Sequence, residues 1–92
     1  MNLKTNDMTK ELMPLPEWFD GQIYPCGSEV TNPFSGSSYA LNATELSMYD
    51  FIIGCNSLIE SGSVSNKLVN EFRKGLTWFR RANPEAYMAL LD

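Results

Sequence analysis

The chain has 92 residues, of which 43% are hydrophobic and 20% charged, and its formal net charge is −4. A chain of this length builds one small domain with one modest core, and its composition argues against disorder along the whole chain. It contains no histidine, which removes the commonest general base and the commonest metal ligand. The longest apolar run covers residues 86–91, far short of a membrane span.

The N-terminal residues show no apolar stretch of the kind that a secretory signal needs, so we expect a cytoplasmic protein. Residues 1–12 are polar with scattered apolar side chains, which predicts a flexible arm or one short helix. Residues 13–41 should form an extended segment plus a β-hairpin, and residues 42–92 a helical part. Cys26 and Cys55 are far apart and in no C-x-x-C arrangement, so we expect two free thiols.

The stretch "MPLPEWFDGQIYP" contains three prolines, which favour extended backbone. Pro16 also suits the start of a short helical turn through residues 17–20 that Gly21 would end. In either conformation, Trp18 and Phe19 are expected to anchor this segment on the rest of the domain.

The next stretch, "SEVTNPFSGSSYAL", has the pattern of a β-hairpin. Asn32 and Pro33 suit the first two positions of a turn, and Gly36 is free to take a positive φ. Two short strands are only marginally stable in water, so this hairpin should pack on a helix.

A first helix is expected between Asn42 and Gly62. Asn42 precedes Glu45 by three residues, as in a capping box, and Thr44 is an alternative cap. Apolar side chains cover most of the circumference of this helix. Because so short a chain has little else to surround such a helix, we predict a homo-oligomer. The residues expected to form the self-association surface are Met48, Ile52, Cys55 and Ile59.

A second helix is expected over residues 64–82, with Gly75 where another backbone approaches closely. Asn83 then caps a third helix that has Pro84 at its first position, and Tyr87, Met88, Leu90 and Leu91 are its inward candidates. The predicted fold class is therefore α+β, a β-hairpin followed by three helices with the first helix central.

The second helix also gathers the positive charge of the chain. Residues 62–81 carry a net charge of +4, and the remainder carries −8. The candidate partner-binding residues on one side of this helix are Lys67, Lys74, Trp78 and Arg81. Trp and Arg are common hot spots of protein interfaces, but a Trp between cations also suits stacking on single-stranded nucleic acid.

Two considerations count against an open binding face on this side of the helix. The overall acidity of the chain opposes binding to nucleic acid. In addition, the pattern is typical of an ordinary solvated helix face, with the "EWF" segment or the third helix folded over Trp78, and this alternative counts against a protein interface as well.

Catalytic residues are hard to find in this sequence. The candidates for acid–base catalysis are the pair Glu17 and Asp20, and Asp50 by itself. Nothing in the sequence positions any of these carboxylates beside a second catalytic group. An enzyme using Asp50 and the hairpin loop would need a deep polar pocket beside Gly54. We therefore expect a protein without catalytic residues, metal or cofactor.

Five strings between Trp18 and Asp92 are distinctive: "WFDG", "NPFSG", "ELSMYDFIIG", "GLTWFR" and "NPEAYMALLD". In these strings the chain resembles small conserved proteins of unknown function from tailed phages of marine cyanobacteria and related marine environmental sequences. The resemblance implies a phage accessory protein in the cytoplasm of an infected bacterial host, and it supplies no activity or site. The function expected is self-association and binding of a protein partner, in assembly or host takeover; the alternative is a single-stranded nucleic-acid-binding module.

Overall fold

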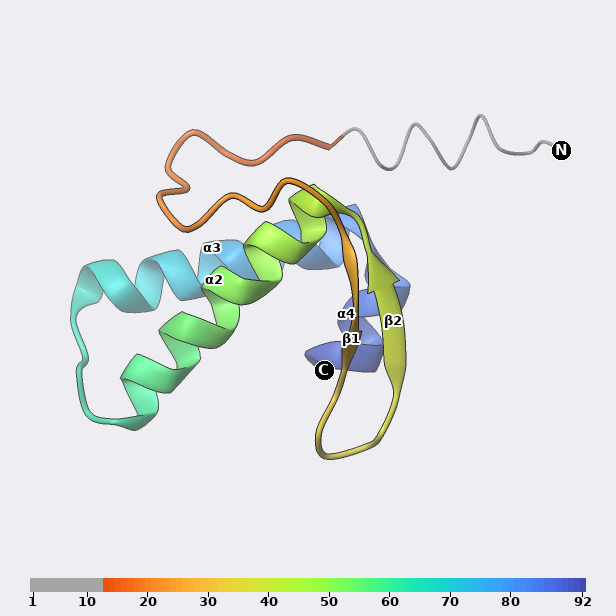
Figure 1. Cartoon of the computed structure of the whole chain (residues 1–92). Helices are drawn as coiled ribbons and strands as arrows, with labels where there is room; N and C mark the ends of the chain where they lie inside the picture. Colours follow the sequence, from red (N-terminus) through yellow and green to blue (C-terminus); the bar gives the residue numbers. More distant parts are fainter. Residues whose placement is uncertain (1–12) are drawn as a thin grey trace, which may run out of the picture.

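The computed structural model describes residues 13–92 and has the predicted α+β fold (Figure 1). Two strands, β1 (Ser28–Thr31) and β2 (Ser38–Leu41), form an antiparallel hairpin. Three helices follow: α2 (Ala43–Glu60), α3 (Asn66–Ala82) and α4 (Pro84–Leu90). The prediction for residues 1–12 falls outside the described residues.

The hairpin turn has the geometry that its sequence predicts. Ser28 pairs with Leu41 and Thr31 with Ser38. Between the strands, the Asn32 carbonyl accepts from the Gly36 N–H at 2.8 Å, and Gly36 has a φ of 80°. A residue with a Cβ would be strained at that φ, so glycine suits the position.

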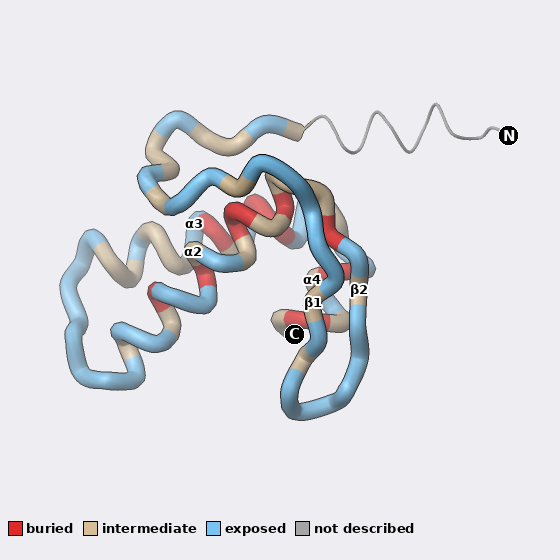
Figure 2. The backbone as a smooth tube through the Cα atoms, viewed as in Figure 1, coloured by how far each residue is buried: buried red, intermediate tan, exposed pale blue. Residues whose placement is uncertain are grey.

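The hairpin packs on helices, as its marginal size requires. Leu41 at the end of β2 is buried in the core, and the Tyr39 hydroxyl donates to Glu85 Oε1 at 3.0 Å, which joins β2 to α4. Figure 2 shows that burial concentrates where α2, α3 and α4 meet the start of the hairpin, while the hairpin tip is exposed. The core therefore lies at one end of the molecule.

Helix α2 begins with a complete capping box. The Asn42 side-chain oxygen accepts from the Glu45 N–H at 2.8 Å, and Glu45 Oε1 accepts from the Asn42 N–H at 3.0 Å. Thr44, the alternative cap, lies inside the helix. Gly62, with a φ of 100°, follows the end of the helix as predicted.

The predicted self-association surface on α2 is wrong, because most of it is already covered by the same chain. Met48 and Ile52 are fully buried, Cys55 is buried, and Ile59 is half-buried. A Cβ on Gly75 of α3 would lie 3.0 Å from Ile52 Cγ1, so side chains of α2, rather than a backbone, approach this glycine.

A neighbouring side of α2 is covered by the N-terminal strap, residues 13–24, which contains a turn where the Phe19 N–H donates to the Pro16 carbonyl at 3.1 Å. The Phe51 ring lies 5.8 Å from Trp18 and 5.3 Å from Phe19, between ring centroids. The Tyr24 N–H donates to the buried Ser47 hydroxyl at 2.9 Å. These contacts confirm Trp18 and Phe19 as anchors and cover a further part of this apolar helix, whereas Ile53 and Leu58 stay exposed.

The remaining helices begin at the expected types of residue. Ser65 caps α3, which starts at Asn66, two residues after the predicted start, and Asn83 caps α4 by accepting from the Ala86 N–H at 3.1 Å. In α4, Leu90 is buried as expected, whereas Met88 is exposed and Ala86 is buried instead. Within residues 13–92, no helix combines the length and apolar character that crossing a membrane requires.

Candidate functional site

Helix α3 carries every basic residue in the part of the chain that the structure describes. Lys67 is paired with Glu71 on the same helix at 2.9 Å, and this hydrogen bond raises the pKa of Lys67. No other ion pair is found within residues 13–92. Four exposed cations are therefore available to a partner: Arg73, Lys74, Arg80 and Arg81.

These four cations surround one residue, Thr77, which is also exposed. Arg73 and Lys74 precede it by four and three residues, and Arg80 and Arg81 follow it by three and four. Residues at these spacings lie on the same face of a helix, one turn apart. We call these five residues the cation face.

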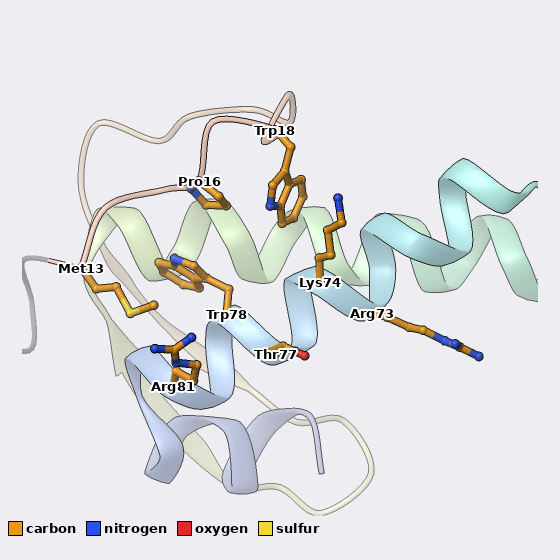
Figure 3. Close-up of a pocket in the computed structure, with 8 residues that line it drawn as sticks. All are labelled: Met13, Pro16, Trp18, Arg73, Lys74, Thr77, Trp78 and Arg81. Carbon is orange, nitrogen blue, oxygen red and sulfur yellow. The ribbon is translucent and has the colours of Figure 1, made fainter.

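A groove of about 360 Å³ lies between one side of the cation face and the N-terminal strap (Figure 3). In this view Lys74 points toward Trp18, and its Nζ is 5.5 Å from the centroid of that ring. Arg73 extends outward from α3. The residues that line this groove are Met13, Pro16, Trp18, Arg73, Lys74, Thr77, Trp78 and Arg81.

Trp78 forms the floor of this groove, and its indole ring does not present an open face to solvent. Its side chain is only 7% exposed, and its indole N–H donates to the Pro14 carbonyl at 2.9 Å. A buried indole N–H needs such a partner, because leaving it without one is costly. The sequence left open whether Trp78 is free or covered by another segment; residues of the strap cover it, so Trp78 does not present a free face to a partner.

A second groove, of about 320 Å³, lies on the other side of the cation face. It is lined by Leu76, Arg80 and Tyr87 and shares Arg73 and Thr77 with the first groove. The Arg80 guanidinium carbon is 5.8 Å from the centroid of the Tyr87 ring. Among the described residues, no carboxylate lines either groove, so this surface attracts negative charge.

Three of the four predicted partner-binding residues come together in this region. Lys74, Trp78 and Arg81 line the first groove, whereas Lys67 lines a separate hollow at the loop between α2 and α3. The sequence prediction omitted Arg73 and Arg80, because it placed the centre of the basic side at Trp78. The symmetric spacing of the cations about Thr77 is the signal that identifies them.

The structure also places the other residues that the sequence offers for chemistry. Within residues 13–92, no group of three or more Cys, Asp or Glu residues is suited to hold a metal ion. Gly54 is exposed, and a Cβ added there would meet nothing within 4 Å, so a deep polar pocket does not adjoin it. Cys26 is exposed and Cys55 buried, both as free thiols, and burial raises the pKa of Cys55.

Comparison with protein-family models, curated proteins and solved structures finds no match to this chain. The interpretation of the cation face therefore depends on its own geometry. Four exposed cations around a hydroxyl, beside a groove with an apolar floor, are suited to hold carboxylate or phosphate groups.

Proposed function

We propose that this chain is a non-catalytic interaction protein that binds an acidic segment of a partner protein along the cation face. The observation that carries the proposal is the set of four exposed cations without an ion-pair partner in the described part of the chain. Because the sequence resembles small phage proteins, we propose that this binding serves assembly or host takeover within an infected bacterium.

An acidic protein segment is favoured over single-stranded nucleic acid by the state of the aromatic rings. Stacking of bases requires free ring faces. Trp78 is buried, Trp18 lies between Lys74 and Phe51, and Tyr87 lies under Arg80. A long polyanion would also be repelled by the acidic residues elsewhere on this net −4 chain.

The expected affinity is modest and depends on salt. Exposed ion pairs contribute about 0.2–1 kcal/mol each, so four of them supply at most about 4 kcal/mol. Met13 and Pro16 in the wall of the first groove offer further apolar contact to the segment. We therefore expect dissociation constants of about 10 μM to 1 mM at low salt, and weaker binding at higher salt.

The test uses a fluorescein-labelled peptide of alternating Glu and Leu, titrated with wild-type protein and followed by fluorescence anisotropy. The double variant Arg73→Gln/Arg80→Gln should bind about two- to thirtyfold more weakly, because it removes two of the four cations, at about 0.2–1 kcal/mol each. The matched control is Lys67→Gln, which removes a cation of the same helix that is already paired with Glu71 and should leave the affinity unchanged.

Two results would overturn the proposal. One is a wild-type protein that does not bind the peptide at low salt, or a control variant that binds as weakly as the double variant. The other is tighter binding to labelled oligothymidylate, accompanied by quenching of Trp fluorescence, which would establish the nucleic-acid alternative instead.

A further inference from the structure

A second surface, apart from the cation face, is formed by the tip of the hairpin. Phe34 in the turn is 97% exposed, and Ile53 on the facing side of α2 is 42% exposed. A single exposed apolar side chain is common on small proteins. Phe34 differs because its backbone is fixed and because it stands beside an apolar groove.

The turn that presents Phe34 is held by Asn32. The Asn32 side-chain oxygen accepts from the Phe34 N–H at 2.9 Å, and its amide group donates to the Ala89 carbonyl of α4 at 3.2 Å. The Asn32 backbone makes two further hydrogen bonds, to Ser37 and Gly36, both at 2.8 Å. The exposed ring is thus presented by a turn that is tied to the body of the protein.

The groove beside Phe34 has a volume of about 450 Å³. It lies between the hairpin turn and the middle of α2, which diverge from each other in Figure 1, with α3 and α4 contributing the remaining walls. Its apolar lining includes Tyr49, Ile53, Phe72, Leu76, Tyr87 and Leu91. Within residues 13–92, Asp92 is the single charged residue that lines this mostly apolar groove, so an apolar occupant is favoured.

We propose that the occupant is a second copy of this chain, docked about a twofold axis with each Phe34 inserted in the groove of the other copy. A twofold interface uses the same patch on both partners, so that patch must be complementary to itself. Here one continuous surface holds both an apolar projection, Phe34, and an apolar groove. This inference is independent of the cation face and goes beyond the proposed function.

The area available sets the strength of this dimer. A covered Phe side chain loses about 200 Å² of accessible surface, and two such insertions, counted on both partners, bury about 800 Å². Ile53 and the rim of each groove bring the total to about 1,000 Å², the lower limit of specific interfaces. We therefore expect a weak dimer, with a dissociation constant of about 10–500 μM.

The proposed dimer agrees with the predicted homo-oligomer but uses a different self-association surface. The sequence prediction chose the side of α2 that contains Ile52, which packs on α3. Ile53, the next residue, lies about 100° further around the helix and remains partly exposed.

The experiment is sedimentation equilibrium of the full chain over about 5 μM to 1 mM, with the variants Phe34→Ala, Ile53→Glu and Val64→Ser. Phe34→Ala should weaken the dimer by about a thousandfold, because an interface anchor is typically worth about thirtyfold and the dimer contains two. Ile53→Glu places a carboxylate on the groove wall and should also give monomers. Val64→Ser, which changes an exposed apolar residue of the α2–α3 loop, is the control and should dimerise as the wild type does.

Folding does not confound this test, because the nearly fully exposed Phe34 ring contributes little to the core, and circular dichroism checks each variant. A wild-type chain that stays monomeric throughout the range would assign the groove to another occupant and overturn the proposal. A dimer that persists in Phe34→Ala would also overturn it. Growth into larger species instead of a closed dimer would exclude the twofold arrangement.

Discussion

The carboxylate of Glu45 connects the starts of two helices, and its removal should measurably destabilise the fold. The side chain is buried. Its Oε1 accepts from the Asn42 N–H, which completes the capping box of α2, and its Oε2 accepts from the Asn83 side-chain amide at 3.1 Å. Because Asn83 also caps α4, one carboxylate fixes the caps of α2 and α4 relative to each other.

We expect Glu45→Ala to lower the free energy of unfolding by about 3 kcal/mol. Losing half of a capping box costs about 1 kcal/mol, and leaving the half-buried Asn83 amide without its partner costs about 1–3 kcal/mol more. A domain of this size has a total stability of roughly 5–14 kcal/mol, so the loss is a large fraction of it. With a urea m-value of about 1.5 kcal/mol/M, the midpoint of unfolding should fall by about 2 M.

The assay is urea unfolding followed by circular dichroism, with Glu45→Gln and Glu60→Ala as companions. Glutamine keeps one acceptor oxygen and should lose roughly half as much stability as alanine does. Glu60 is an exposed acid in the last turn of the same helix, where a negative charge is unfavourable, so its removal should be neutral or slightly stabilising. A Glu45→Ala variant within about 0.5 kcal/mol of wild type would refute the linked-cap reasoning.

Two further predictions concern the backbone and the thiols. Gly27→Ala should lower the melting temperature, since a Cβ there collides with the Leu41 carbonyl oxygen, a backbone atom that cannot turn aside; an unchanged melting curve would contradict this contact. Iodoacetamide followed by mass spectrometry should modify Cys26 quickly and Cys55 only in urea. Because burial raises the pKa of Cys55 from 9.0, the unfolded chain releases that proton first, and stability should fall as pH rises above about 9.

The sequence by itself determined the features that depend on neighbouring residues. The capping box of Asn42 and Glu45 closes within one helical turn, and the hairpin turn closes between Asn32 and Gly36. Asn83 and Pro84 likewise set the start of α4 from adjacent positions. Such contacts cost little chain entropy to form, so local pattern is enough to predict them.

Only the tertiary structure decided which apolar and cationic side chains face solvent. Helical periodicity placed Trp78 away from the apolar side of α3, yet the Pro14 carbonyl, 64 positions away in the chain, covers it. Periodicity likewise could not distinguish Ile52, which packs on α3, from Ile53, which borders a groove. The periodicity of a helix predicts which residues share a face. Whether that face is buried depends on where distant segments of the chain pack on it, and the sequence of the helix alone does not determine this.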